Sequence, residues 1–478
     1  MTRDAWARHL GGPVPDTLRA ELAAGTLPAV AAASAAARPD RVAVEVDGEA
    51  LTHGRLDAAV AAAAGLLAER GVGPADTVVL AAPASVRFVV AYLAVQRLGA
   101  AVVPVDPVQP AAAVRSVVDA AGARFVLDDA RLSALAAARP RRPVGTVERP
   151  GNGDVAVLAF TSGTTGAPKG VPITHANLLA SARAAMLAWR WHDGDVLSHA
   201  LPLFHQHGLG GLHMTLIAGT TARLGSRFDP AAPVHPDTTV FFGVPAMWHR
   251  LLERPPVLAG MARLRLAVSG SAPLPPPVAD RVAEHLGQVP LERYGLTESG
   301  LDVSNPYDGP RVAGTVGFPL PGVELRLGDQ DEIELRGPQV IDTYWGGVAP
   351  EAFRFDGWFR TGDLGRLDAE GRLTIVGRLK ELIITGGHNV VPGEVEAVLA
   401  GQPGVAEVAV AGVPSARWGE EVTAFVVAGS PAPDPDALLA AARERLVPYK
   451  VPKSVRFLDA LPRNAMGKIQ RTVLGEAP

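Results

Sequence analysis

The sequence predicts an α/β protein, with a large N-terminal domain of α/β layered subdomains plus a β-barrel-like subdomain, followed by a small α+β C-terminal domain. Short apolar runs alternate with helix-like segments until about residue 270. From about residue 312 the pattern changes to short strands and turns. Beyond Gly377 a charged stretch, 378–381, leads into a β-α-β pattern of its own. At 478 residues the chain is long enough for roughly three domains.

The α/β alternation begins near the N-terminus. Residues 55–72 have the apolar spacing of an amphipathic helix, and residues 78–82 predict a buried strand. A helix at 86–98 and a short strand at 101–103 follow, and the alternation repeats over 110–128. Because helices between consecutive strands are typical of parallel sheets, we expect a mainly parallel sheet.

The later elements follow in the same order. Residues 136–153, rich in Arg, Pro and Gly, predict a connector. The α/β pattern then continues through 155–160, 196–202, 210–218, 239–244 and 264–269. In the β-rich part the strand-like runs are 323–327, 332–335 and 373–376. We therefore place the large domain at 1–377 and the small domain at 381–478.

Composition excludes several classes of partner and of chemistry. The net charge is −4, without blocks of Lys or Arg, so neither nucleic acid nor an anionic membrane is the expected partner. The absence of cysteine excludes disulfides, thiolate nucleophiles and cysteine metal ligands, and fits a reducing cytoplasm. No apolar signal-peptide region is evident, and Gln96 and Arg97 interrupt the apolar run 88–103. We expect a soluble, cytoplasmic protein that binds small molecules.

Residues 158–170 predict a phosphate-binding loop, which follows an apolar run and precedes a helix-like segment. Glycines let the backbone approach an anion, hydroxyls donate hydrogen bonds and a lysine adds a mobile positive charge. The residues concerned are Thr161, Ser162, Gly163, Thr164, Thr165, Gly166, Lys169 and Gly170. Pro168 precedes the lysine and Gly170 replaces the magnesium-binding Ser or Thr, so this is not a Walker loop. A surface turn is the structural alternative.

Seven segments together resemble the core motifs of the acyl-adenylating enzymes, the superfamily of acyl-CoA synthetases, firefly luciferase and peptide-synthetase adenylation domains. Besides the loop they are 203–207, 243–250, 269–273, 292–299, 358–363 and 462–471. The resemblance covers nearly the whole chain. It extends to bacterial malonyl-CoA and methylmalonyl-CoA synthetases through phrases such as Pro-Leu-Phe-His-x-His-Gly-Leu and Glu-Arg-Tyr-Gly-x-Thr-Glu. The resemblance implies an ATP-dependent ligase that uses Mg²⁺ and coenzyme A and forms an acyl-adenylate before the thioester.

Carboxylate attack on the α-phosphate of ATP needs charge neutralisation, a metal and a held nucleotide. Tyr294 offers an aromatic face for adenine, Thr297 a hydroxyl for the α-phosphate and Glu298 a carboxylate for Mg²⁺. The resemblance gives these residues the same roles. It adds nucleotide contacts at Gly270, Ser271, Ala272 and Gly295, and ribose contacts at Asp363 and Arg378. Thr297 and Glu298 could instead cap a helix, and Asp363 could instead be part of an ordinary Gly-Asp turn.

The resemblance also implies a mobile C-terminal domain that rotates at a hinge, 378–380, with Lys380 at the pivot. Lys468 resembles the lysine that bridges the acyl carboxylate and the α-phosphate during adenylation. His205 resembles a gating histidine, whereas His207 and His213 do not predict a metal site because no cysteine or nearby carboxylate completes a ligand set. In the second half-reaction, Gly387 resembles the loop that lines the pantetheine tunnel, and Trp418, Tyr449 and Lys453 resemble positions that hold free CoA.

Two arginines hold the distal carboxylate in malonyl-CoA synthetases, and Arg250 and Arg293 occupy similar positions here. We expect charge-assisted hydrogen bonds from both, with Ser271 and His205 as further substrate contacts. Arg250 could instead cap a helix or pair with Glu253, and Trp418 could be buried packing. The segment 299–302 departs from the malonyl enzymes, which leaves the pocket shape open.

Three other activities stay open at this stage. They are an adenylating enzyme that loads a carrier protein, a ligase for an aryl acid and a diazotase-like relative that activates nitrite. A nucleotide-binding regulator without catalysis is disfavoured, because Glu298, Asp363 and Lys468 occur together. The sequence predicts nothing about the oligomeric state.

Overall fold

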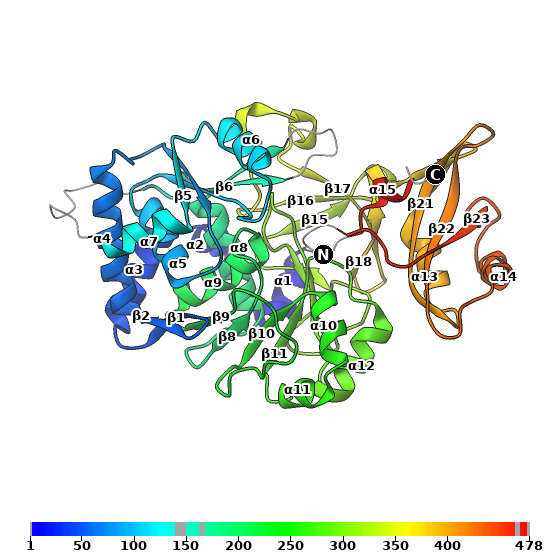
Figure 1. Ribbon diagram of the computed structural model, residues 1–478, viewed down its shortest axis with the longest axis horizontal. Helices are drawn as coiled ribbons and strands as arrows, with labels where there is room; N and C mark the ends of the chain where they lie inside the picture. The colour runs from blue at the N-terminus through cyan, green and yellow to red at the C-terminus, as the bar shows by residue number, and fades with distance from the viewer. Residues whose placement is uncertain (1, 139–149, 162–167, 464–468, 476–478) are drawn as a thin grey trace. The chain divides into compact units, whose positions relative to one another are not determined.

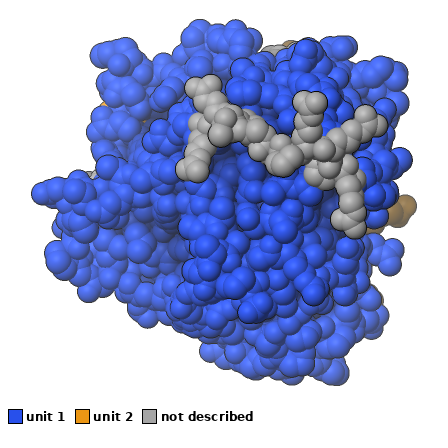
Figure 2. Space-filling model, turned by 90° about the vertical axis from the view of Figure 1, so that its left-hand side faces the viewer, with its two compact units in different colours: residues 1–325, 335–360, 369–373 blue, residues 326–334, 361–368, 374–478 orange. Residues whose placement is uncertain are grey.

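The computed structural model describes residues 2–138, 150–161, 168–463 and 469–475. The chain forms two compact units, which Figure 2 colours separately. Unit 1 comprises Met1–Leu325, Leu335–Arg360 and Ala369–Leu373, and unit 2 comprises Arg326–Glu334, Thr361–Asp368 and Thr374–Pro478. Unit 2 thus includes part of the β-rich region, and the division expected at 378–380 stays a prediction.

A five-stranded sheet of unit 1 begins with the strands that the sequence predicted at 78–82 and 101–103. Its order is β5-β3-β4-β6-β7, with β3 (Thr77–Ala81), β4 (Ala101–Pro104), β5 (Phe125–Asp128), β6 (Val155–Thr161) and β7 (Lys169–Thr174). All neighbours pair in parallel except β6 and β7, which are antiparallel. The expectation of a mainly parallel sheet is therefore confirmed.

Local capping sets where the helices of this region begin. The Thr52 hydroxyl accepts a hydrogen bond from the Arg55 N–H at the start of α4 (His53–Glu69), and the Ser85 hydroxyl accepts one from the Phe88 N–H at α5 (Val86–Arg97). These are the helices predicted at 55–72 and 86–98. Others are α3 (Leu27–Ala37), α6 (Ala111–Ala121) and α7 (Asp129–Ala137). Figure 1 shows α3, α4, α5 and α7 close together, and they pack on one another.

A nine-stranded sheet forms the other half of unit 1, in the order β14-β13-β12-β11-β10-β8-β9-β1-β2. The strands are β1 (Val42–Val46), β2 (Glu49–Thr52), β8 (Val196–His199), β9 (Thr221–Leu224), β10 (Val240–Gly243), β11 (Leu266–Ser269), β12 (Leu291–Tyr294), β13 (Val303–Ser304) and β14 (Phe318–Pro319). The strands in the middle of this sheet pair in parallel, in the order β1, β9, β8, β10, β11 and β12. Ligands of such sheets bind outside the carboxyl ends of the strands. The segments after β8, β10, β11 and β12 meet at that edge.

The described residues of unit 1 form seven further helices. They are α1 (Thr2–Leu10), α2 (Leu18–Leu22), α8 (His175–Ala188), α9 (Gln206–Ala218), α10 (Pro245–Leu252), α11 (Pro255–Gly260) and α12 (Pro276–Leu286). The side chains of Trp189 and Trp248 are fully buried in this part of the core. Within the described ranges, no helix is both long and apolar enough to span a bilayer.

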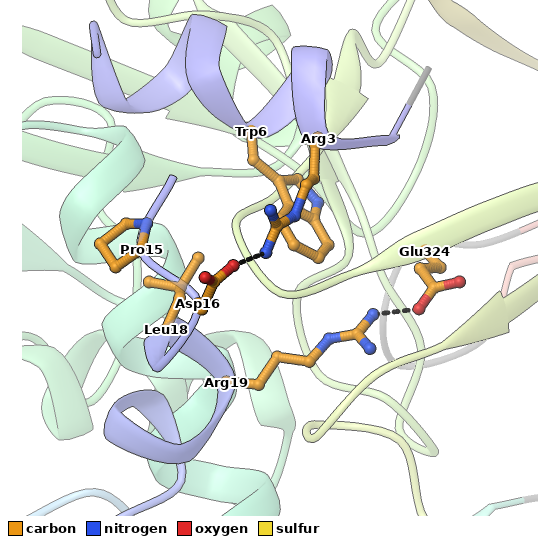
Figure 3. A pocket seen from close by; sticks show the side chains of 7 residues that line it. All are labelled: Arg3, Trp6, Pro15, Asp16, Leu18, Arg19 and Glu324. Carbon is orange, nitrogen blue, oxygen red and sulfur yellow. Dashed lines mark hydrogen bonds and ion pairs between the residues drawn. The ribbon is translucent and has the colours of Figure 1, made fainter. Parts of the chain in front are cut away.

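A pocket of about 260 Å³ opens between α1, α2 and β15 (Glu324–Leu327). Figure 3 shows Arg3 directed at Asp16, with 2.5 Å between the guanidinium and the carboxylate, and Arg19 directed at Glu324. The charges are thus paired within the pocket, and none of the predicted site residues lines it. We assign it no ligand.

The β-rich region is a four-stranded sheet in the order β15-β16-β17-β18, with β16 (Glu332–Arg336), β17 (Phe359–Leu367) and β18 (Leu373–Arg378). The predicted runs at 323–327, 332–335 and 373–376 coincide with three of these strands. Short 3₁₀ turns in the region are η1 (Asp329–Asp331), η2 (Trp345–Gly347), η3 (Pro350–Ala352) and η4 (Leu379–Glu381).

The rest of unit 2 has the α+β character that the sequence predicted. Its sheet has the order β20-β19-β22-β21, with β23 beside β22. The elements are β19 (Ile383–Thr385), β20 (His388–Val390), α13 (Pro392–Leu399), β21 (Val405–Ser415), β22 (Gly419–Ala428), α14 (Pro435–Arg445), β23 (Ser454–Leu458) and α15 (Arg471–Gly475). Val395, Val410 and Val426 belong to its hydrophobic core.

Candidate active site

The phosphate loop connects two antiparallel strands. Thr161, the last residue of β6, pairs with Lys169, the first residue of β7. A strand that the sequence analysis did not predict therefore separates the loop from α8. Pro172 is compatible with this strand because β7 is the edge of its sheet. Ser162, Gly163, Thr164, Thr165 and Gly166 lie outside the described residues.

Gly170 makes room for an aromatic side chain. A Cβ added at Gly170 would lie 2.7 Å from the Cβ of Trp345, which is too close for any side chain. We expected this glycine to bring the backbone near an anion. Its position in β7 also allows the η2 turn to pack on the strand, and the role at an anion stays a prediction.

The segment after β11 and strand β12 bring Gly270 and Arg293 together. A Cβ on Gly270 would lie 2.4 Å from Nε of Arg293, so only glycine leaves space for this guanidinium. The Arg293 side chain is buried, and its Nε has no hydrogen-bond partner among the described residues. Burial lowers the pKa of Arg293 to about 10, while the charge of Asp302 opposes this shift. Arg293 is therefore a buried cation at neutral pH.

Ser271 and His207 lie next to this cation. Ser271 has a φ of +70°, an uncommon conformation for a residue with a side chain. Its Oγ is 3.1 Å from Nδ1 of His207, near the start of α9. Burial, with the charge of Arg293 second, lowers the pKa of His207 well below its usual value. The imidazole is thus neutral, and its buried Nε2 has no partner among the described residues. The sequence had not predicted a role for His207 beyond rejecting it as a metal ligand.

Glu292, in β12, holds the loop that carries Ser271. Its carboxylate accepts hydrogen bonds from the Leu274 N–H at 2.9 Å and from the Gly314 N–H at 3.2 Å. Burial nevertheless raises the pKa of Glu292 to about 7. We did not predict this role, although Glu292 opens the Glu-Arg-Tyr-Gly phrase.

The turn after β12 presents Thr297 and Glu298. Gly295 packs against the backbone of Gly300, since an added Cβ would lie 1.9 Å from the Gly300 carbonyl oxygen. The Gly300 N–H closes the turn by donating to the Leu296 carbonyl at 2.8 Å. The chain then enters β13, so Thr297 and Glu298 do not cap a helix. Tyr294, at the end of β12, is 9% exposed.

Tyr344 connects Glu298 to the lysine of the phosphate loop. Its hydroxyl donates to Oε1 of Glu298 at 3.0 Å. Nζ of Lys169 lies 5.3 Å from the centroid of the Tyr344 ring, within the range of a cation–π interaction. Burial, followed by the Glu298 charge, raises the pKa of Tyr344, which keeps its hydroxyl protonated. No sequence motif had indicated Tyr344.

A second acid, Asp302, is fully buried behind Arg293 and the turn. Its carboxylate accepts hydrogen bonds from the Ser299 hydroxyl at 2.5 Å and from the Gln339 amide at 3.1 Å. Burial raises the pKa of Asp302 to about 7, against the opposing effects of these donors and of Arg293. The departure noted at 299–302 thus places a titratable group in the wall of the site.

The other predicted residues of unit 1 lie on or next to α9 and α10. His205 is the residue before α9, and its ring packs on Phe204 with centroids 4.6 Å apart. Arg250, in the last turn of α10, is exposed, and its guanidinium lies 5.3 Å from the Phe228 ring centroid. The two arginines therefore differ in burial, and their joint action stays a prediction. His213 is buried in α9, with Nε2 2.8 Å from the Tyr92 hydroxyl.

In unit 2, Asp363 and Arg378 form the pair expected at the ribose. Nε of Arg378 lies 2.8 Å from Oδ1 of Asp363, whose side chain is buried. The Asp363 N–H donates to the Thr361 hydroxyl at 3.0 Å, and Gly362 between them has a φ of +72°. This turn fixes the carboxylate at the middle of β17.

Three of the four residues predicted for CoA surround one hairpin of unit 2. Gly386 and Gly387 both have positive φ and join β19 to β20. Trp418 packs on this turn, since a Cβ at Gly386 would lie 2.9 Å from its ring. Tyr449 stacks on His388 with centroids 4.4 Å apart. Trp418 is 38% exposed, which disagrees with buried packing.

The remaining predicted residues are Lys453, Lys380 and Lys468. Nζ of Lys453 lies 3.4 Å from the Pro448 carbonyl oxygen. Lys380 is in η4, directly after β18. Lys468 lies outside the described residues. The roles of all three stay predictions.

The donor groups near Glu298 fit Mg²⁺ bound together with a nucleotide. In the described part of the chain, no group of three or more His, Cys, Asp or Glu is placed to hold a metal by itself. Mg²⁺ with ATP usually takes one or two carboxylates and completes its octahedron with phosphate oxygens and water. The single carboxylate of Glu298, held by Tyr344, suits that arrangement.

Comparison with known families and proteins is consistent with this site. The sequence profile described as AMP-binding enzyme matches residues 31–345, and that of its C-terminal domain matches residues 394–468. A feruloyl-CoA synthase from Amycolatopsis sp is 36% identical over 466 residues, which cover 90% of this chain and 94% of that protein. A malonate–CoA ligase from Arabidopsis thaliana is 37% identical over 366 residues, covering 67% and 60% respectively.

Two solved structures are similar throughout. ATP-bound MatB from Rhodopseudomonas palustris has a TM-score of 0.84 and 34% identity, with 100% of this chain and 99% of that chain covered. An o-succinylbenzoate CoA synthetase from Bacillus subtilis, in complex with ATP and a magnesium ion, has a TM-score of 0.83 and 29% identity, with 93% and 98% covered.

Proposed function

The chain belongs to the AMP-binding enzyme family as an ATP-dependent acyl-CoA ligase, and we propose that its acid is a short dicarboxylate of the malonate or methylmalonate type. The reaction uses ATP, Mg²⁺ and coenzyme A. A carboxylate oxygen of the acid attacks the α-phosphorus and pyrophosphate leaves. The CoA thiol then attacks the acyl carbon and AMP leaves.

In this proposal the residues of the site divide the work of adenylation. Lys169 and the hydroxyls of the phosphate loop hold the departing pyrophosphate, and Thr297 donates to the α-phosphate. Mg²⁺, when bound at Glu298, neutralises charge on the phosphates. Lys468 bridges the attacking carboxylate and the α-phosphate. For the ribose, the Asp363 carboxylate accepts hydrogen bonds from the hydroxyls beside Arg378.

The observation that carries the choice of acid is the buried guanidinium of Arg293. A buried cation whose Nε has no partner among the described residues is stabilised by an anion that offsets its desolvation. The Ser271 hydroxyl and the His207 imidazole lie beside it and offer neutral polar contacts. A distal carboxylate of the substrate would satisfy these groups, whereas a long apolar chain would leave them unpaired.

The test is pyrophosphate release with a panel of malonate, methylmalonate, succinate, propionate and benzoate, each with and without CoA. We expect a dicarboxylate to exceed propionate by about tenfold to a hundredfold in kcat/KM, since a lost charged hydrogen bond costs about 1.5–3 kcal/mol. Arg293→Met should remove that preference more than it lowers activity with propionate. Equal activity with propionate and malonate would contradict the proposal.

An aryl acid is the second candidate, because the feruloyl-CoA synthase matches more of this chain than the malonate–CoA ligase does. The same panel extended by ferulate would identify that activity. Loading of a carrier protein predicts AMP release that does not depend on CoA. A nitrite-activating enzyme predicts AMP formation with nitrite and an aminoarene.

A further inference from the structure

Tyr344 contacts both Glu298, the proposed Mg²⁺ ligand, and Lys169, the proposed pyrophosphate contact. Its hydroxyl bonds to the Glu298 carboxylate, and its ring face lies below the Lys169 ammonium. Lys169 belongs to the five-stranded sheet and Glu298 to the turn after β12 of the nine-stranded sheet. One buried side chain therefore joins groups that two separate sheets supply.

The chain around Tyr344 is fixed on several sides. The Ile341 N–H donates to the Glu298 carbonyl at 3.0 Å, so the same residue is held through its backbone and its side chain. The Asn177 amide of α8 donates to the carbonyls of Pro338 and Val340 at 2.9 and 3.0 Å. On the other side, the Tyr344 ring packs edge-to-face on Phe353 with centroids 5.5 Å apart.

Trp345 completes this arrangement by packing on β7. The missing side chain of Gly170 lets Trp345 approach the strand directly beside Lys169. The segment 338–345, which we name the brace, thus contacts β7, α8 and the Glu298 turn. All of these residues lie in unit 1.

We propose that Tyr344 is a positioning residue that fixes the Glu298 carboxylate for Mg²⁺ and keeps Lys169 in register with it, so that the metal and the pyrophosphate contacts form one rigid unit. The inference rests on the proposed roles of Glu298 and Lys169. If the inference holds, loss of the Tyr344 hydroxyl weakens metal binding and leaves pyrophosphate binding unchanged, because the ring that faces Lys169 remains. Loss of the whole ring should weaken both metal and pyrophosphate binding.

Two substitutions separate these effects. Tyr344→Phe keeps the ring and its packing on Phe353, and Tyr344→Leu removes both. Mn²⁺ serves as the probe, with its binding to the enzyme·ATP complex followed by electron paramagnetic resonance in the absence of any acid. Pyrophosphate binding is measured separately by calorimetry. Tyr307→Phe is the matched control, because Tyr307 is a partly buried tyrosine beside Arg265, away from these residues.

We expect Tyr344→Phe to raise the Kd of Mn²⁺ about tenfold and to leave the Kd of pyrophosphate within twofold, in line with the loss of one charged hydrogen bond. Tyr344→Leu should raise both constants, and Lys169→Met should raise only that of pyrophosphate. If Tyr344→Phe leaves the Mn²⁺ affinity unchanged while Glu298→Gln weakens it, the inference about Tyr344 is overturned and the metal assignment of Glu298 stands. Unchanged affinity in Glu298→Gln would overturn the metal assignment together with it. A failure of dicarboxylates as substrates affects neither result, since no acid is present.

Discussion

Arg293 occupies the space that the missing side chain of Gly270 provides, because a Cβ there would lie 2.4 Å from its Nε. The guanidinium is buried, and its charge acts on His207 and Asp302, which are buried as well. The position of the cation that would select the substrate is thus set by a residue that contacts no substrate through a side chain.

Gly270→Ala should therefore change the choice of acid. The added methyl group displaces the guanidinium, and we expect kcat/KM for the preferred dicarboxylate to fall about tenfold to a hundredfold more than that for propionate. Steady-state pyrophosphate release with both acids measures this. Gly260→Ala, where an added Cβ meets nothing within 4 Å, is the control. Equal losses with both acids would show that Gly270 acts on the nucleotide instead.

Asp363→Asn should weaken recognition of the ribose. The amide accepts fewer hydrogen bonds than the carboxylate and no longer pairs with Arg378, so KM for ATP should rise about tenfold. The discrimination between ATP and 2′-deoxy-ATP should shrink in the variant. Steady-state rates with both nucleotides test this, and an undiminished preference for ATP would argue against a ribose contact.

Stability should fall as pH rises towards and through neutrality. Burial raises the pKa of Asp302 and of Glu292 to about 7, so the folded chain keeps protons that the unfolded chain loses near 3.8 and 4.5. Between those values and about pH 7 the free energy of unfolding should fall, by at most about 1.4 kcal/mol per pH unit for each group. Above this range the contribution is constant.

Asp302→Asn should remove its part of this slope. Urea unfolding at several pH values between 3.8 and about 7, the pKa values of Asp302 in the unfolded and the folded chain, measures how the free energy of unfolding changes with pH. Asp459→Asn, at an exposed position, is the control. An identical slope in wild type and Asp302→Asn would mean that the folded chain holds this carboxyl ionised, through Arg293 and its two donors.

Gly386→Ala should affect thioester formation and not adenylation. The residue has a φ of +56°, and its Cβ would lie 2.9 Å from the Trp418 ring. We expect transfer from isolated acyl-adenylate to CoA to slow at least about tenfold, since the turn and Trp418 both shift. Single-turnover transfer measures this. Gly371→Ala, at a φ of +84° with open space around it, controls for backbone strain.

The sequence predicted those elements whose signal is local. The helix at 86–98 has its cap at Ser85, and the buried strand at 78–82 is a short apolar run, so both could be predicted. Tyr294, Asp363 and Gly387 were predicted as site residues because the motifs around them resemble those of the acyl-adenylating enzymes. β7 was missed because residues 169–174 contain Gly170 and Pro172, which are typical of loops, and only pairing with β6 makes them a strand.

Contacts between distant segments could not be predicted. Tyr344 meets Glu298 only because the brace crosses the end of β12, and neither residue type nor spacing records that crossing. The contrast between buried Arg293 and exposed Arg250 likewise depends on which face of the fold each element presents. Burial of Asp302 follows from the same tertiary packing.

The two hydrogen bonds to Glu292 have a consequence for a chain without cysteine. One carboxylate holds the amides of Leu274 and Gly314, so it acts as a non-covalent cross-link between the loop of Ser271 and the chain that leads into the β-rich region. A disulfide in this place would depend on the redox state of its surroundings, whereas this link does not. Hydrogen exchange at Leu274 and Gly314 should therefore report one common opening of the site.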